Sequence, residues 1–248
     1  NGMNLTIDIG NTCTKLVAFD NQTIVEARRI EHGEYALLHE FAMSYSFDAG
    51  ICSSVIDIDD DTRNTIDGLP FEVIYLESGV TPIPIINKYK TPFTLGSDRL
   101  AAAVGAYMRS QGHDVLVVDI GTCITYDFVT SRGEYLGGNI SPGPRIRLSA
   151  LHEHTGKLPL VSRRGDTPSL GYDTTTAIRS GVLRGVEYEL RGYIEEFSEK
   201  YPSLLVYLTG GVRLDLHISE KKCIFADDFI VPEGLNRILT YTKELSQK

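Results

Sequence analysis

The sequence lacks the features that mark membrane, secreted and disordered proteins. Its longest purely apolar runs, such as Val115 to Val118, are far shorter than the roughly 20 residues of a membrane-spanning helix. No basic segment leads into an apolar one in the manner of a secretory signal, and no low-complexity stretch or long proline-rich linker interrupts the chain. We therefore expect a globular, cytoplasmic protein with no membrane partner.

Paired cysteines and a basic surface are missing too. The four cysteines form no CxxC or CxxH pair, which argues against a zinc site and for a reduced chain. They are Cys13, Cys52, Cys123 and Cys223. The formal net charge of −9 would repel the phosphates of nucleic acids. The nearest approach to a basic patch is four arginines at 145, 147, 163 and 164, which are more typical of a solvated face or a small-anion contact. No nucleic-acid partner is expected.

One pattern occurs twice in the chain. LTIDIGNTCTKLVAFD begins at Leu5 and LVVDIGTCITYDFV at Leu116, and each predicts a strand, a glycine turn and a second strand. A Walker loop or a dinucleotide fold would place a helix after its glycines, and neither GxxxxGK(S/T) nor GxGxxG occurs in these segments. We therefore predict two similar α/β lobes, residues 3–112 and 113–248, that divide near Gly112.

Three later segments complete the expected architecture. LLVYLTGGV, from Leu204, predicts a buried strand followed by glycines that let the backbone approach a flat ligand. Apolar residues at helical spacing predict one helix over Thr174 to Tyr201 and another from Glu233. A loop with proline and glycine runs into an alanine-rich helix over Thr91 to Tyr107.

The first glycine turn carries the groups that a nucleoside triphosphate requires. Gly10 lets the backbone come close, the polar residues at 11, 12 and 14 add hydrogen-bond donors, and Lys15 adds a positive charge. Asp8 is suited to hold Mg²⁺ through water, because this cation prefers oxygen ligands and keeps part of its hydration shell. A purely structural hairpin is the alternative, and the second copy together with TGG favours phosphate binding.

The segment TPFTLGSDR offers a candidate catalytic group. Ser97 or Asp98 is expected to cap the following helix. At the mouth between the two lobes, Asp98 would instead present a carboxylate to an acceptor hydroxyl, and Arg99 a forked donor to an anionic substrate. A carboxylate at a helix N-terminus tends to stay ionised, so Asp98 would orient the hydroxyl and take its proton late.

Taken in order, the motifs resemble type III pantothenate kinase over nearly the whole chain. They are DIGNTCTK, YKTPFTLGSDR, DIGTCITYD, GGNISPG, TTTAIRSG and LTGG. The resemblance implies the fold of the acetate and sugar kinase, Hsc70 and actin superfamily, with two ribonuclease-H-like lobes and ATP between them. It also implies an ATP-dependent phosphotransferase that acts on the primary hydroxyl of pantothenate, in the first step of coenzyme A biosynthesis.

The same resemblance implies a role for particular residues. Asp98 would be the general base, and Thr122 would contact ATP. Asp119 would bind a potassium or ammonium ion. The phosphate loop would comprise Asp8, Ile9, Gly10, Asn11, Thr12, Cys13, Thr14 and Lys15. Pantothenate would contact Tyr89, Gly96, Ser97, Asp98, Arg99 and, in a homodimer with a shared active site, Thr174 of the partner subunit.

One departure from the family pattern concerns the second turn. Cys123 and Ile124 stand where the family commonly has Ala and Thr, so bulkier and less polar side chains are expected in that turn and the monovalent cation is the weaker prediction. Two alternative functions stay open. One is a transcription accessory protein, which the acidic charge disfavours, and the other is a different small-molecule kinase or ATPase on the same fold.

Overall fold

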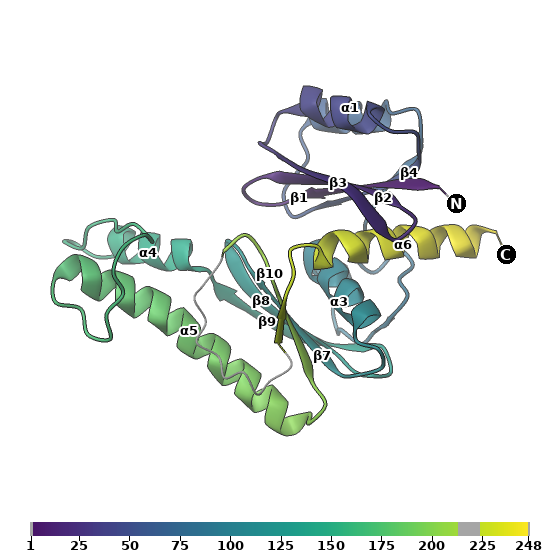
Figure 1. Cartoon of the computed structure of the whole chain (residues 1–248). Helices are drawn as coiled ribbons and strands as arrows, with labels where there is room; N and C mark the ends of the chain where they lie inside the picture. Colours follow the sequence, from purple (N-terminus) through teal and green to yellow (C-terminus); the bar gives the residue numbers. More distant parts are fainter. Residues whose placement is uncertain (1, 213–223, 248) are drawn as a thin grey trace. The chain divides into compact units, whose positions relative to one another are not determined.

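The computed structural model describes residues 2–212 and 224–247, which form a mixed α/β fold with two sheets (Figure 1). Two compact units divide the chain. Unit 1 comprises Asn1–Gly112, Val129–Gly137 and Phe229–Lys248, and unit 2 comprises His113–Phe128 and Gly138–Asp228. The C-terminal helix therefore packs within unit 1. The predicted lobes follow the duplicated pattern rather than compactness, and their boundaries stay a prediction.

Unit 1 contains a five-stranded sheet with the order β3-β2-β1-β4-β5. Its strands are β1 (Met3–Ile9), β2 (Thr14–Asp20), β3 (Thr23–Ile30), β4 (Phe47–Ser54) and β5 (Val73–Tyr75). The first three strands are antiparallel and joined by short turns, whereas β4 and β5 run parallel to β1. Parallel neighbours need a crossover, which α1 (Tyr35–Met43) and α2 (Asp60–Asp67) supply.

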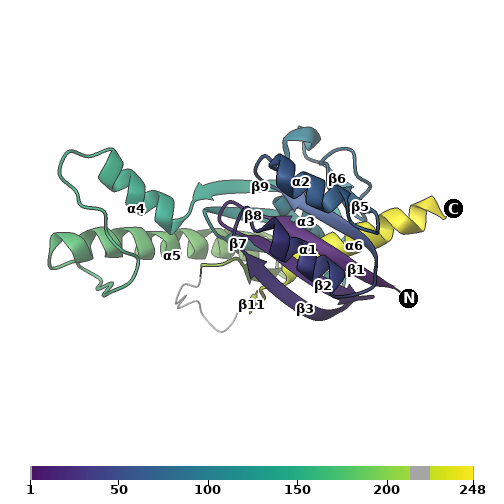
Figure 2. The same cartoon turned by 90° about the horizontal axis from the view of Figure 1, so that it is seen from above.

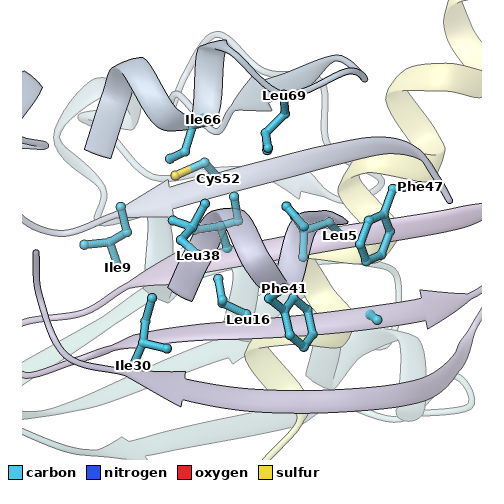
Figure 3. Close-up of a cluster of buried hydrophobic side chains, with 13 residues drawn as sticks. Leu5, Ile9, Leu16, Ile30, Leu38, Phe41, Phe47, Cys52, Ile66 and Leu69 are labelled. Carbon is cyan, nitrogen blue, oxygen red and sulfur yellow. The ribbon is translucent and has the colours of Figure 1, made fainter. Parts of the chain in front are cut away.

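Polar and apolar residues alternate along β1. Because successive side chains of a strand point to opposite faces of the sheet, this alternation gives the sheet one apolar and one polar face. Leu5, Ile7 and Ile9 pack under α1 and α2, whose Leu38 and Ile66 close a core (Figure 3). The other face of β1 carries Asn4, Thr6 and Asp8. The sequence MNLTIDI thus makes one face apolar and leaves the other for polar contacts.

Two helices of unit 1, α3 (Ser97–Arg109) and α6 (Ile230–Ser246), lie on the side of this sheet opposite α1 (Figure 1). Asn4 donates to the side chain of Asn236 on α6 at 2.8 Å. Arg109 and Glu233 join α3 to α6 by two hydrogen bonds of 2.7 and 2.6 Å. Helix α6 begins three residues earlier than the predicted Glu233, at Ile230.

The second sheet has the order β11-β10-β7-β8-β9-β6. Its strands are β6 (Ile86–Asn87), β7 (Val115–Ile120), β8 (Cys123–Val129), β9 (Glu134–Pro142), β10 (Leu205–Thr209) and β11 (Ile224–Ala226). Strand β6 and the first residues of β9 belong to unit 1, and the other strands lie wholly or mostly in unit 2. The strand predicted before TGG is confirmed as β10.

A long helix, α5 (Thr174–Lys200), covers the core of unit 2 (Figure 1). Its Val186, Leu190 and Ile194 pack against the apolar residues of β7 and β8. The predicted helix from Thr174 is therefore confirmed. Ile124 is fully buried in the same core, so the expectation that it fills the second turn is wrong, because β8 has already begun at Cys123.

At one end of unit 2, α4 (Pro144–Glu153) packs beside α5 (Figure 2). A small cluster of Leu148, Val161, Ile178 and Val182 joins the two helices. In the parts of the chain that the structure describes, no helix is both long enough and apolar enough to cross a membrane.

Candidate active site

The first glycine turn connects β1 to β2 in unit 1. The two strands pair so that Asp8 lies opposite Lys15. The Gly10 amide donates to the Cys13 carbonyl at 3.0 Å and closes the turn, while Asn11 and Thr12 at its tip are exposed. This geometry places a carboxylate and an ammonium on paired residues, with exposed polar side chains next to them.

The start of α3 is anchored beside this hairpin by serines. Ser53, near the end of β4, is the parallel neighbour of Asp8 and is completely buried. Its hydroxyl donates to Ser97 Oγ at 2.8 Å, and Ser97 Oγ donates to the Ser54 carbonyl at 3.1 Å. These bonds hold the first turn of α3, including Asp98, near the end of β1.

Two carboxyl groups from different motifs meet there. Burial and the charge of Asp98 raise the pKa of Asp8 to about 6, and Lys15 offsets this only in part. Burial also raises the pKa of Asp98, although its Oδ1 accepts the Arg99 amide at 2.8 Å. The stabilisation expected from the helix N-terminus is therefore outweighed by desolvation.

Capping of α3 differs from the prediction. The N-cap residue is Gly96, which makes no side-chain cap bond, so the expectation that Ser97 or Asp98 caps the helix is wrong. Ser97 bonds to β4 instead, because its position in the first turn brings it against the strand end. The side chain of Asp98 bonds the next amide in its own helix.

Arg99 is held by two tyrosines of unit 1. Its side chain is only 5% exposed, Nη2 donates to the Tyr135 hydroxyl at 3.1 Å, and the guanidinium carbon lies 5.7 Å from the centre of the Tyr89 ring. Tyr89 thus shares one neighbourhood with the residues from Gly96 to Arg99. Thr174 belongs to unit 2, where it is the exposed first residue of α5.

Sequence reasoning misses Ser53 and Tyr135 in this neighbourhood. Ser53 follows the buried run Ala49–Cys52, and the rule that parallel strands end at one edge of a sheet could have pointed to it. Tyr135 has no such signal. It reaches Tyr89 and Arg99 only because β9 pairs with β6, Asn87 opposite Tyr135.

The second glycine turn, in unit 2, is contacted closely by two glycines from other segments, Gly210 and Gly143. At Gly210, which has φ +107°, a Cβ would lie 2.6 Å from Asp119 Oδ1 and 2.4 Å from the Ile120 carbonyl oxygen. At Gly143 a Cβ would lie 2.3 and 2.4 Å from the carbonyl oxygens of Gly121 and Thr122. Only glycine allows these approaches, so LTGG and GGNISPG both pack against the turn after Asp119.

The glycines inside the turns are less crowded by protein atoms than Gly143 and Gly210. A Cβ at Gly121 would meet nothing nearer than 3.8 Å, and one at Gly10 only the Cys13 carbonyl oxygen at 3.3 Å. Neither glycine has a positive φ. The space that a Cβ would fill at each turn, beside Asp119 in the second, suits a phosphate that approaches the backbone closely.

The carboxylates fit a divalent cation that keeps part of its water shell. Within the described residues, no three His, Cys, Asp or Glu side chains form a metal-binding group. Asp8 provides oxygen ligands, and a cation there would offset the negative charge of Asp98, which raises the pKa of Asp8. Mg²⁺ is typically bound by one or two carboxylates together with substrate phosphates, so the residues present fit this ion.

Known proteins share the chain's sequence along nearly its full length. A family model of type III pantothenate kinase matches residues 4–196. The type III pantothenate kinase of Phocaeicola vulgatus is 50% identical over 243 residues, 98% of this chain and 100% of the relative. That of Bacteroides fragilis is 49% identical over 239 residues, 96% of this chain and 98% of the relative.

More distant solved structures share the fold. The activator of 2-hydroxyisocaproyl-CoA dehydratase from Clostridium difficile, with bound ADPNP, has a TM-score of 0.55 at 13% identity and covers 99% of this chain and 97% of its own. A candidate Baf family transcriptional activator from Campylobacter jejuni has a TM-score of 0.61 at 20% identity, with coverage of 97% and 99%. The predicted two-lobed, actin-like ATPase fold is confirmed. On the strength of the family match and the full-length identity, the chain belongs to the type III pantothenate kinases, ATP-dependent enzymes of the first step of coenzyme A biosynthesis.

Proposed function

We propose that this chain transfers the γ-phosphoryl group of ATP to the primary hydroxyl of pantothenate, with Asp98 as general base. The observation that carries the assignment of the site is geometric: Ser53, the strand neighbour of Asp8, bonds Ser97 and so holds Asp98 near the end of β1. Burial raises the pKa of both carboxyl groups there. Perturbed carboxyl groups of this kind gather at catalytic sites. Family membership supplies the identity of the acceptor.

The phosphates of ATP would bind to the loop from Asp8 to Lys15 and to Thr122. A divalent cation, held by Asp8, would spread the charge of the transferring phosphoryl group. Asp119 would hold potassium or ammonium, a role that rests on the resemblance to the family. Cys123 is the first residue of β8 and thus borders this turn.

Asp98 would accept the hydroxyl proton of pantothenate. Its Oδ1 accepts the Arg99 amide hydrogen, so the proton would go to Oδ2. Desolvation moves the pKa of this carboxyl upward, closer to the working pH, where a general base is more effective. Tyr89 and the residues from Gly96 to Arg99 would contact the substrate and position its hydroxyl.

Release of ADP, measured in a coupled assay with pantothenate, K⁺ and Mg²⁺, tests the reaction. ADP should form well above a control without acceptor. Asp98→Asn should lower kcat by a factor on the order of 10³ and leave ATP binding, measured by calorimetry, largely intact. Asp61→Asn, which changes an exposed carboxylate in the first turn of α2, is the matched control and should be as active as the wild type.

Two results would overturn this assignment. ADP formation with another hydroxylated metabolite but not with pantothenate would refute the substrate. Loss of ATP binding in Asp98→Asn would make Asp98 a structural residue rather than the base.

We further propose a homodimer in which Thr174 of the partner subunit completes each active site. Supporting this, α4 and α5 border a groove of about 750 Å³, lined by Thr174, Ala177, Gly181, Leu151 and Leu158 among others. Large apolar side chains are exposed elsewhere in unit 2, with Leu160 at 62% and Leu170 at 85%.

Two glycines of α5 provide a matched test of the dimer. A Cβ at Gly181 or at Gly192 would have no atom within 4 Å, so a large residue at either position leaves the subunit fold undisturbed. Gly181 lines the groove and Gly192 does not. In light scattering, Gly181→Arg should be monomeric and inactive, and Gly192→Arg dimeric and active. A monomeric, fully active wild type would refute the shared site.

The remaining parts of the proposal are a cytoplasmic location and lobes at 3–112 and 113–248. The described cysteines, Cys13, Cys52 and Cys123, are free thiols, which supports a reducing compartment. Cys223 lies outside the described residues. The two hairpins, one in each unit, support the lobe division.

A further inference from the structure

Glu189 of α5 connects three segments of unit 2. Its Oε1 accepts a hydrogen bond from the Tyr126 hydroxyl of β8 at 2.8 Å, and its Oε2 pairs with Arg147 of α4. Arg147 also donates to Ser141 Oγ at 2.8 Å and to the Pro142 carbonyl at 2.7 Å. We call these five residues the Glu189 network.

One end of the Glu189 network leads directly to the second glycine turn. Gly143 follows Pro142, its amide donates to the Thr122 carbonyl at 2.9 Å, and its Cα packs on the Gly121 and Thr122 carbonyl groups so tightly that a Cβ would overlap them. Because Arg147 holds Ser141 and Pro142, it fixes the segment that supports the turn.

The other end reaches the turn through β8. This strand begins at Cys123, directly after the turn, and carries Tyr126 three residues later. Glu189 therefore reaches the Gly121–Thr122 turn by two routes. Through Tyr126 it holds β8, which follows the turn, and through Arg147 it holds the end of β9, which precedes Gly143.

We propose that Arg147 and Glu189 are positioning residues, which hold the Gly121–Thr122 turn in the conformation that binds ATP. The inference rests on the proposed function and adds to it the residues that act through the turn. A planar guanidinium suits this task, because Nε and Nη2 bind different partners in a fixed geometry that a lysine ammonium cannot reproduce.

A purely structural ion pair is the competing explanation, and the chain offers a control for it. Arg109 and Glu233 form a comparable pair between two helices of unit 1, with side chains 29% and 28% exposed. Arg147 and Glu189 are 21% and 22% exposed. Arg147→Met and Arg109→Met remove the same chemical group from partly buried positions. The first change touches the Glu189 network and also the groove beside α5, so light scattering must show that this variant has the same oligomeric state as the wild type.

Nucleotide affinity, measured by calorimetry on the full-length protein, separates the two explanations. Arg147→Met should weaken ATP and ADP binding about tenfold and raise KM for ATP to match, with KM for pantothenate within about twofold of the wild type. Arg147→Lys should recover only part of the loss. Arg109→Met should lower Tm by a similar amount to Arg147→Met and leave nucleotide affinity unchanged.

If Arg147→Met lowers Tm but binds nucleotide as the wild type does, the inference is wrong. An equal rise in KM for ATP and for pantothenate would also refute it. Should Arg147→Met fail to fold, Glu189→Gln decides. Its amide oxygen can accept from Tyr126 or from Arg147, but the charge and one of the two acceptor oxygens are lost; it should weaken ATP binding about threefold. A wild type that binds ATP but does not phosphorylate pantothenate would refute the proposed function alone, and one that binds no nucleotide would refute both.

Discussion

In the first glycine turn, four residues separate β1 from β2 and two of them are exposed, whereas only Gly121 and Thr122 separate β7 from β8 in the second. The first turn is closed within its own hairpin, by the bond from Gly10 to Cys13. The second has a similar bond from Gly121 to Cys123, and in addition Gly143 and Gly210 pack against it.

A repeated motif can therefore serve two different tasks in one chain. Asp8 and Lys15 are paired across the first hairpin, so that turn brings opposite charges together and has a further carboxylate, Asp98, close by. The second turn has no lysine opposite its aspartate, and its distinguishing feature is support by other segments. We interpret the first turn as the source of charge and the second as a shaped backbone surface.

The largest expected effect comes from exchanging the two aspartates for asparagine, one at a time. Asp8→Asn should lower kcat/KM by roughly 10³-fold, because it removes the ligand of the divalent cation. Asp119→Asn should cost about tenfold and shift the K⁺ concentration for half-maximal rate. Steady-state kinetics at several K⁺ and Mg²⁺ concentrations measure both. Equal losses in the two variants would contradict the division of tasks.

Stability provides the control for Asp8→Asn. The pKa of Asp8 is raised from 3.8 to about 6, so the folded protein holds this proton more tightly than the unfolded chain does. Ionisation above pH 6 therefore destabilises the metal-free protein. The neutral variant should be more stable at pH 8, by on the order of 3 kcal/mol, and its loss of activity cannot then be ascribed to unfolding.

A second pair of variants compares a glycine inside the second turn with a glycine that supports it. Gly143→Ala should lower the free energy of unfolding by roughly 3 kcal/mol, because its Cβ meets two backbone oxygens that cannot move independently. Gly121→Ala should leave stability within about 0.5 kcal/mol, since no protein atom obstructs the Cβ. Chemical denaturation measures this difference.

The same two variants test where the phosphate lies. Gly121→Ala should weaken ATP binding about tenfold although its fold is intact, because the methyl group occupies the space beside Asp119. If Gly121→Ala binds ATP as tightly as the wild type, the second turn does not hold phosphates, and its glycine has no function that the structure explains.

Local patterns predicted both hairpins and the helix from Thr174, because period-two alternation, a glycine turn and helical spacing are written in consecutive residues. The core position of Ile124 was not predicted, since it depends on how early β8 begins. The prediction that Ser97 or Asp98 is the N-cap of α3 was also wrong. The Ser97 hydroxyl donates to the Ser54 carbonyl at the end of β4, 43 residues earlier in the chain, instead of capping its own helix.

The support of the second turn could not be predicted for a similar reason. Arg147 was interpreted as part of a solvated face or an anion contact, yet it is mostly buried against Glu189, 42 residues later. Gly143 belongs to the motif GGNISPG, but nothing local shows that it packs on Gly121. The candidate catalytic residues were found from motifs, whereas the residues that hold them depend on contacts between distant segments.

The smallest expected effect concerns the pH dependence of stability at Glu189. Burial raises the pKa of this carboxyl, but the hydrogen bonds from Arg147, Ser141 and Tyr126 outweigh it and lower the pKa below 4.5. A depressed pKa contributes stability above the unfolded value, and this contribution is lost as the pH falls through the folded value.

Glu189→Gln should therefore be less stable than the wild type by about 1 kcal/mol at pH 7, the usual range for a partly buried charged hydrogen bond. The difference should shrink below about pH 4.5, because a protonated glutamate resembles glutamine. Urea denaturation at pH 7, 5.5 and 4 measures it. Glu40→Gln, at an ion pair whose glutamate is 65% exposed, is the control and should change stability by less than about 0.5 kcal/mol at each pH. If the stability difference between Glu189→Gln and the wild type stayed constant down to pH 4, packing rather than the charge of the Glu189 carboxylate would hold α5 to this part of unit 2.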